Sequence, residues 1–478
     1  MEFTAICKYT TLLEKGNMRN KSQSYFLNSQ AHINFITEYR PTYFDSVTDS
    51  FEQTESIYCP RFPSLIKSDN TVWHFASIYL NNLLIAQRKS TALLESVASD
   101  LIDFLRFLEH TELDILHLPP KAEKRVTYQF HTSLLQRIRL GLISPSTARQ
   151  RMNRILRFYD FLISENVFTL EELKNRPYEK IKTYVSCISS TGDIYKKQVD
   201  SSNLKIRHSP RPSYGDEIID GGRLHPLTPN EKNIFLRYLE QYASRDFQLI
   251  CYMALYTGAR LQTICTLRVM HIKEMISNQK VNSIDDTYTL KAGGKSIIDT
   301  KNGYELNLKI PAWLINDINQ YLCSESWKKR ASHSFYKIND MNYIFLTKYG
   351  NPYYTSIKEI EDHNLQPFTK NTKYSIHKGN AARQSLLKLI YLMHKNKEPI
   401  RTFTLHDLRA TFGVDLLLSA SKHVNDMDQI LPYIQSRMGH RNIMSTMHYV
   451  RYIAFSNLDN ESDKKFEEIL YKFDKVND

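Results

Sequence analysis

The sequence predicts a mainly α-helical protein with a small β-sheet, an α+β fold. Two stretches, residues 90–108 and 144–163, carry apolar side chains at the three- and four-residue spacing of amphipathic helices. A later stretch, residues 306–310, alternates apolar and polar side chains as a half-buried strand does. Hydrophobic residues make up 42% of the 478 residues, which is enough for packed cores.

The charge balance points to a polyanionic partner. The chain has 63 Lys and Arg against 51 Asp and Glu, a net charge of +12, which favours nucleic acid, although many basic proteins bind no DNA specifically. The six cysteines show no paired spacing, so neither a disulfide framework nor a zinc cluster is expected. No apolar run approaches the roughly 20 residues of a membrane span and no signal peptide is evident, so we expect a cytoplasmic protein without a membrane partner.

Changes in composition divide the chain into four parts. Residues 1–70 show no sustained period and are interpreted as an extension of unknown role. Residues 71–185 form a helical domain, and residues 186–226, rich in Ser, Gly, Pro and charge, read as a linker. The last part, residues 227–478, opens sharply, because Thr228-Pro229-Asn230-Glu231 is a capping box with Pro at the first helical position.

A basic face is predicted on the helix that begins at Ser144 and Pro145. No acidic residue lies between Ser133 and Tyr159, and the candidate DNA-binding residues in and before this helix are Arg137, Arg139, Arg149, Arg151, Arg154 and Arg157. A merely solvated surface is the plain alternative for such a charge run.

Four short segments of the second half contain residues suited to phosphate chemistry. The first, Thr257-Gly258-Ala259-Arg260, ends an apolar helix with a turn that presents an arginine, although a surface arginine at a helix end is common. In the second, Asn302-Gly303 separates residues 296–300 from the strand at 306–310, which predicts that Lys301 stands at the tip of a β-hairpin.

The other two segments are more specific. In Thr404-Leu405-His406-Asp407-Leu408-Arg409, a helix would place His406 and Arg409 on one face, unless they are a core-edge His and a salt-bridging Arg. The last segment runs from Met438-Gly439-His440 to Tyr449, nine residues after the histidine.

Taken in order, these four segments resemble the signature of the tyrosine recombinase (phage integrase) family. The resemblance implies a helical core-binding domain over residues 71–185 and a mixed, mainly α catalytic domain over residues 227–478. It also implies cleavage and rejoining of DNA through a covalent 3′-phosphotyrosyl intermediate. The family usually has an acidic residue three positions after the first arginine, where this chain has Thr263.

The resemblance assigns a role to each of six residues. Attack on a phosphodiester builds negative charge on the non-bridging oxygens, which Arg260 and Arg409 would clamp. Tyr449 would be the nucleophile and His406 the general acid/base. Lys301, with Lys295 as the fallback, would protonate the leaving 5′ oxygen, and His440 would donate a hydrogen bond to the phosphate.

The expected partner is double-stranded DNA, with no metal, nucleotide or other small-molecule cofactor. Family members act as homotetramers in which a C-terminal segment reaches a neighbour; Lys464 to Phe473 is the candidate here, although a solvated terminal helix fits it equally. The function expected is DNA recombination or integration of a mobile element. Two alternatives stay open: a catalytically weak DNA-binding protein on the same scaffold, and a type IB topoisomerase-like enzyme that relaxes DNA.

Overall fold

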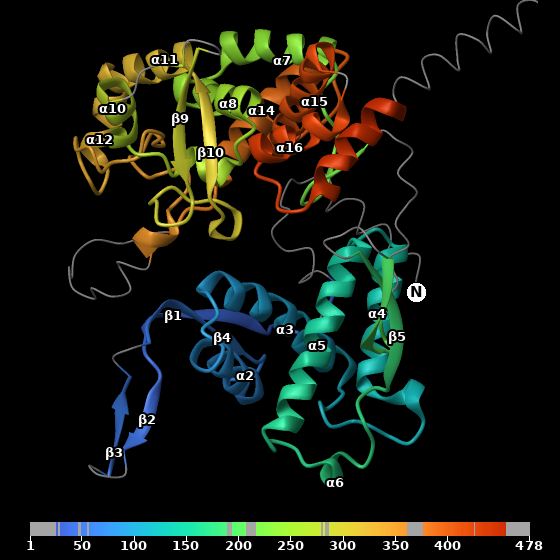
Figure 1. The fold of residues 1–478 in the computed structure, drawn as a ribbon. Helices are drawn as coiled ribbons and strands as arrows, with labels where there is room; N and C mark the ends of the chain where they lie inside the picture. The colour runs from blue at the N-terminus through green and yellow to red at the C-terminus, as the bar shows by residue number, and fades with distance from the viewer. Residues whose placement is uncertain are drawn as a thin grey trace, which may run out of the picture. The chain divides into compact units, whose positions relative to one another are not determined.

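The structure is a computed structural model, and it describes residues 25–26, 29–45, 49–54, 57–188, 194–206, 217–278, 281–282, 286–360, 376–424 and 426–455. The chain divides into two compact units, Met1–Pro210 and Arg211–Asp478. Helices dominate both units, which confirms the mainly α prediction (Figure 1). In the described residues the strands form several two-stranded antiparallel pairs instead of one small sheet.

The first unit is built around a bundle of helices. Its helices are α2 (His74–Ile85), α3 (Thr91–Thr111), α4 (Val126–Arg139), α5 (Pro145–Ser164) and α6 (Leu170–Leu173), and its strands are β1 (His32–Tyr39), β2 (Thr42–Asp45), β3 (Ser50–Gln53), β4 (Cys59–Ile66), β5 (Lys180–Ile188) and β6 (Ile194–Ser202). As predicted, α5 begins at Ser144, whose side chain accepts a hydrogen bond from the backbone N–H of Thr147, with Pro145 at the first helical position.

Two of the predicted boundaries differ from the structure. Strands β1 and β4 pair with each other and β4 packs on α3, with Phe62 and Leu65 buried in the same core as the helices, so part of residues 1–70 belongs to the first unit. The predicted linker contains most of the β5–β6 hairpin. The described residues of β5 are largely exposed, so this hairpin does not depend on a buried apolar face.

Three of the six candidate DNA-binding arginines are paired with acids of the first unit. Arg137 is 1% exposed and makes two hydrogen bonds to Asp103, at 2.9 and 2.8 Å. Arg151 is paired with Asp100 at 3.1 Å and with Asp103 at 2.7 Å, and Arg154 with Asp100 at 2.5 Å. The prediction that Arg137 and Arg151 face DNA is therefore wrong. The acids that neutralise them lie on α3, outside the acid-free residues 133–159 on which the prediction was based.

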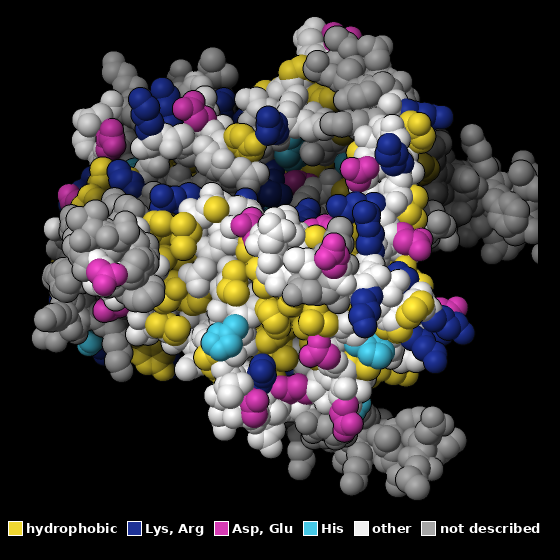
Figure 2. All heavy atoms as spheres, turned by 90° about the horizontal axis from the view of Figure 1, so that it is seen from below, with side chains coloured by type: hydrophobic (Ala, Val, Ile, Leu, Met, Phe, Trp, Pro, Cys, Tyr) yellow, Lys and Arg dark blue, Asp and Glu magenta, His cyan; other side chains and the backbone are white. Residues whose placement is uncertain are grey.

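The other arginines of that set remain at the surface. Arg139 and Arg157 are exposed and Arg149 is half-buried. Arg149, Arg154 and Arg157 line a groove of about 1200 Å³, together with Lys89 and Arg176. In the space-filling view, Lys and Arg side chains lie at several places on the visible face, with Asp and Glu side chains among them (Figure 2). Contact of Arg139, Arg149, Arg154 and Arg157 with DNA stays a prediction.

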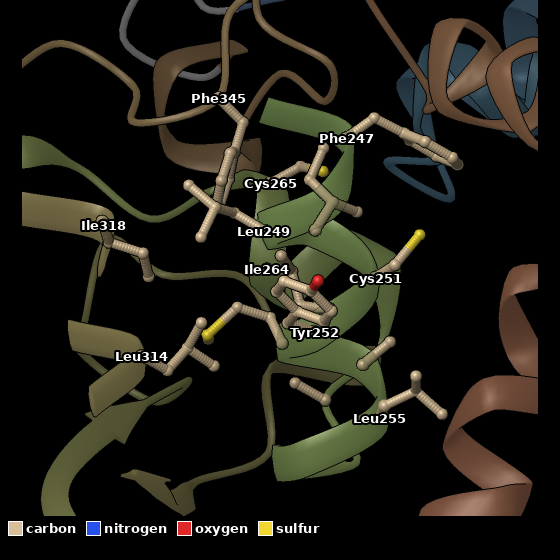
Figure 3. Close-up of a cluster of buried hydrophobic side chains, with 14 of the residues drawn as sticks. Phe247, Leu249, Cys251, Tyr252, Leu255, Ile264, Cys265, Leu314, Ile318 and Phe345 are labelled. Carbon is tan, nitrogen blue, oxygen red and sulfur yellow. The ribbon is translucent and has the colours of Figure 1, made fainter. Parts of the chain in front are cut away.

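The second unit packs its helices around α8 (Arg245–Thr257). Figure 3 shows apolar side chains of α8 and of the segments around it, among them Leu255, Ile264, Leu314 and Phe345, gathered at this helix. The other helices are α7 (Pro229–Tyr242), α9 (Leu261–Cys265), α10 (Val269–Asn278), α11 (Ala312–Cys323), α12 (Glu325–His333), α14 (Asn380–Lys395), α15 (Leu405–His423) and α16 (Met427–Met438), and the strands are β7 (Ile218–Ile219), β8 (Arg223–Leu224), β9 (Thr287–Ala292) and β10 (Leu306–Pro311). None of the helices in the described residues is both long and apolar enough to cross a membrane.

The predicted hairpin around Lys301 is only partly correct. Strand β10 forms where the alternation indicated, but its partner is β9, not residues 296–300 (Figure 1). Lys301 therefore lies in the long connection between the two strands, in the short 3-10 turn Lys301–Gly303, where Asn302 and Gly303 both have positive φ. Asn-Gly correctly predicted a turn but not the strand pairing, because eight residues of irregular chain separate β9 from that turn.

Candidate active site

A buried carboxylate, Asp220, lies at the centre of the predicted site. It follows β7, in the turn that joins β7 to β8, and it is 5% exposed. Five of the six predicted catalytic residues contact it: Arg260, His406, Arg409, His440 and Tyr449. Four of them reach its carboxylate and His406 reaches its backbone carbonyl, so residues that lie up to 229 positions away in the sequence converge on this one residue.

Arg260 is presented by a turn that requires glycine. Helix α8 ends at Gly258, which has φ +68°, and a β-carbon there would lie 2.4 Å from the ring of Phe412 on α15. Arg260 then begins α9 as its N-cap residue, and its Nη2 donates to Asp220 Oδ1 at 3.1 Å. Its side chain is 23% exposed, so it borders both the cluster and solvent.

Arg409 lies on the first turns of α15, which opens with the predicted capping box of Thr404 and Asp407. Its side chain is 2% exposed. Its Nε donates to Asp220 Oδ2 at 3.1 Å, while Nη1 donates to the carbonyl of Gly258 and Nη2 to the carbonyl of Met438 at 2.7 Å. The same guanidinium therefore holds the ends of α8 and α16 in place while it faces the carboxylate.

Two histidines contact Asp220 through different atoms. His406 Nε2 lies 2.8 Å from the backbone carbonyl oxygen of Asp220, an acceptor, so this nitrogen carries the proton. His440, just after Gly439 ends α16 in the left-handed conformation, places Nε2 3.2 Å from Asp220 Oδ2 and Nδ1 3.0 Å from the hydroxyl of Thr446. Burial, the largest influence, lowers the pKa of both imidazoles.

Tyr449 lies in the helical residues 443–455 and is completely buried. Its hydroxyl donates to Asp220 Oδ2 at 3.4 Å. The ring packs directly on the backbone of α15, since a β-carbon placed on Gly413 would lie 2.3 Å from Tyr449 Cε1. Burial and then the negative charge of Asp220 raise the pKa of the Tyr449 phenol, against the opposing charge of Arg409.

Lys301 lies in the connection between β9 and β10, and its side chain reaches the turn that contains Asp220 and Gly221. Its Nζ would lie 3.1 Å from a β-carbon on Gly221, the residue after Asp220. Lys295, the fallback, is exposed and lines a pocket of about 770 Å³ together with Gly439, His440 and Arg441. Both lysines thus lie beside the cluster, with Lys301 directly at the Asp220–Gly221 turn.

The arrangement is that of an anion site. Burial by itself would raise the pKa of the Asp220 carboxyl, but the hydrogen bond with His440 and the charges of Arg409 and Arg260 hold that pKa well below its usual range. Two guanidinium groups and two imidazoles with a phenol beside them can bind a carboxylate or a phosphate in the same way. No cluster of three or more His, Cys, Asp or Glu able to hold a metal ion occurs among the residues that the structure describes.

Sequence reasoning did not find Asp220 or Gly413. Asp220 was placed in the predicted linker, although Asp220-Gly221 between Ile219 and Leu224 carries the composition of a tight hairpin turn. Gly413 had no local signal, because its need for a hydrogen in place of a side chain comes from Tyr449, far along the chain. The candidate intersubunit segment Lys464 to Phe473 lies outside the described residues.

No family model matches the chain, and no curated protein matches it. Among solved structures it is similar to the Tn1549 transposon integrase in complex with circular intermediate DNA, with 14% identity and a TM-score of 0.42, over 78% of this chain and 94% of that chain. It is also similar to a lambda integrase dimer bound to a COC′ core site, with 12% identity and a TM-score of 0.42, over 79% of this chain and 94% of that one.

Proposed function

We propose that this chain is a site-specific DNA recombinase of the tyrosine recombinase type, which cuts and rejoins DNA strands with Tyr449 as the nucleophile. The observation that supports the proposal is the convergence of five residues on the buried Asp220: its carboxylate contacts Arg260, Arg409, His440 and Tyr449, and its backbone carbonyl contacts His406. A chance set of three short motifs has no reason to meet at one point in the fold.

In the proposed reaction, a DNA phosphate takes the place at which Asp220 is bound. Arg260 and Arg409 neutralise the charge that builds on the non-bridging oxygens, and His440 donates a further hydrogen bond to them. The Tyr449 hydroxyl gives its proton to His406 as its oxygen bonds to phosphorus. The bond from phosphorus to the 5′ oxygen then breaks, and that oxygen takes a proton from Lys301.

The products of this first step are a 3′-phosphotyrosyl bond and a free 5′ hydroxyl. Attack of a 5′ hydroxyl from a partner strand on the same phosphorus releases Tyr449, which regains its proton. The phosphodiester bonds broken and formed are equivalent, so no nucleotide has to be hydrolysed to drive the exchange. Assembly of four chains on double-stranded DNA is part of the proposal. Its candidate contacts to the DNA backbone are the exposed Arg139 and Arg157 and the half-buried Arg149.

The test is the capture of the covalent intermediate on a pool of nicked duplexes whose sequences on both sides of the nick are randomised. Cleavage near the nick releases a short fragment that carries the 5′ hydroxyl, so religation fails and the protein–DNA adduct accumulates. We expect an adduct that survives denaturation, forms in EDTA and is absent in Tyr449→Phe. Tyr433→Phe is the matched control, because this tyrosine is 42% exposed on α16.

Other outcomes would favour the alternatives. Tight DNA binding without any adduct would overturn the catalytic proposal in favour of a DNA-binding protein. An adduct accompanied by relaxation of supercoiled circles, with no recombinant product on the DNA that the adduct identifies, would favour a type IB topoisomerase activity. Cleavage abolished by EDTA would contradict the metal-free mechanism.

A further inference from the structure

The segment that carries Asp220 occupies the place where the substrate phosphate has to bind. This segment, residues 217–224, is called the strap: it consists of Glu217, the two short strands β7 and β8, and the turn between them. Asp220 Oδ1 binds Arg260 at 3.1 Å, and Oδ2 lies 3.1 Å from Arg409 Nε and 3.2 Å from His440 Nε2. The carboxylate thus uses the donors that the proposed function gives to the two non-bridging oxygens.

The position of Tyr449 shows that the overlap involves the reacting centre itself. A nucleophile ready for attack lies about 3–3.5 Å from the atom it attacks. The Tyr449 hydroxyl is 3.4 Å from Asp220 Oδ2, so this carboxylate oxygen stands in the volume that the phosphate group would fill. A carboxylate and a phosphodiester cannot both occupy it, because they exclude each other sterically and both are anionic.

A permanent supporting acid would be arranged differently. An acid at position 263, where this chain has threonine, would have to bind the side of Arg260 that faces away from Tyr449. The side toward Tyr449 would then stay open to substrate. Asp220 instead lies between Arg260, Arg409 and Tyr449. Its placement is that of a competitor for the donors of the site.

Apart from Asp220, the strap is held by the pairing of its two strands and by two buried side chains. Its strands pair through Ile218 with Leu224 and Ile219 with Arg223, and the side chains of Ile218 and Leu224 are buried against residues of α15 and α16. The turn contains Gly221, with φ +70°, and Gly222, and a turn with two glycines can change conformation at low steric cost. Asp220 can therefore leave the site by rearrangement of a short segment, without unfolding of a helix.

We propose that the strap is an autoinhibitory element in which Asp220 acts as an internal phosphate mimic that DNA must displace before Tyr449 can react. This inference rests on the proposed function for its catalytic consequence, but the masking of an anion site can be measured separately. When a competent state is only partly populated, the apparent affinity for its ligand falls by the same fraction. If the strap is closed in about 90–99% of molecules, removing the carboxylate should strengthen anion binding about 10- to 100-fold.

The experiment compares the full-length wild type with Asp220→Asn and Asp220→Ala by calorimetric titration of inorganic phosphate and by the adduct assay on randomised nicked duplexes. Asp317→Asn is the control for net charge, since Asp317 is paired with Arg245 on the surface of α11. We expect both Asp220 variants to bind phosphate at least about 10-fold more tightly than the wild type, and to form the adduct faster by a similar factor. The control should match the wild type in both assays.

The outcomes separate the two proposals. If the wild type forms the adduct and both Asp220 variants form it more slowly, with no gain in phosphate binding, Asp220 is a supporting acid and the autoinhibition is wrong while the function stands. If phosphate binding is gained but no protein forms an adduct, the strap masks an anion site and the recombinase proposal fails. Should the variants fold poorly, hydrogen exchange of the wild type supplies the test: amides 217–224 must lose protection when the nicked duplexes bind, and unchanged protection would overturn the inference.

Discussion

Replacing Gly413 by alanine should displace the proposed nucleophile, because this position has no room for a methyl group. The added carbon would lie 2.3 Å from Tyr449 Cε1, 2.9 Å from Cδ1 and 3.0 Å from the Met438 methyl, and the Tyr449 ring is completely buried. Overpacking of a core costs about 1–3 kcal/mol. Alanine in a helix interior recovers about 1 kcal/mol relative to glycine, so the net loss of stability should be only about 0–2 kcal/mol.

The loss of activity should be much larger than the loss of stability. A shift of about 1 Å in a reacting group costs on the order of 100-fold in rate, and the ring can avoid the methyl only by moving. The assay is the rate of adduct formation by Gly413→Ala, with thermal unfolding measured on the same samples. Ser419→Ala, at an exposed position of the same helix, is the control and should behave as the wild type.

A double-mutant cycle tests the physical reason. In a Tyr449→Ala background the ring is absent and the new methyl meets a cavity, so Gly413→Ala should change from destabilising to stabilising by about 1 kcal/mol. An equal cost in both backgrounds, or an unchanged adduct rate in the single variant, would refute the argument that Gly413 exists to seat this ring.

Three further predictions concern other parts of the molecule. Asp103→Asn removes the carboxylate that neutralises Arg137 inside the first unit, and it should lower the free energy of unfolding by about 3–5 kcal/mol in calorimetry; a loss below 1 kcal/mol would mean that this network is not structural. Arg157→Ala should weaken DNA binding about equally for all sequences and reduce the slope of log affinity against log salt by about 1, which titrations at several salt concentrations will check; an unchanged slope would remove Arg157 from the DNA interface. The pKa values of His406 and His440 are lowered, so both imidazoles should stay neutral down to about pH 6.5, the ordinary pKa of histidine. The rate of adduct formation should therefore be constant from about pH 8 to pH 6.5 and fall only at lower pH. A midpoint of the rate above about pH 7 would contradict the argument that burial lowers these pKa values.

The parts of the fold that follow from local chemistry were predictable from the sequence. The capping boxes of Thr228 with Glu231 and of Thr404 with Asp407 are both present, because such a box is complete within four residues. The strand at Leu306–Pro311 also forms where alternation indicated.

The parts that depend on distant partners were not predictable. The charge of Arg137 predicted a basic surface, but whether a buried acid neutralises it depends on how α3 and α4 pack. The same holds for Asp220, whose role arises from residues on α9, α15 and the last described helix. A family motif supplied the identity of the site residues, yet it contains no position for a group that competes with the substrate.

The way Arg409 is bound has a consequence for the evolution of the chain. Because its guanidinium joins the carbonyls of Gly258 and Met438, selection for folding alone would preserve this arginine in a descendant that had lost strand exchange. Arg260, which is 23% exposed, would be freer to drift in such a descendant. Among future homologues, the presence of the first arginine, and not of the second, should therefore separate active enzymes from decayed copies.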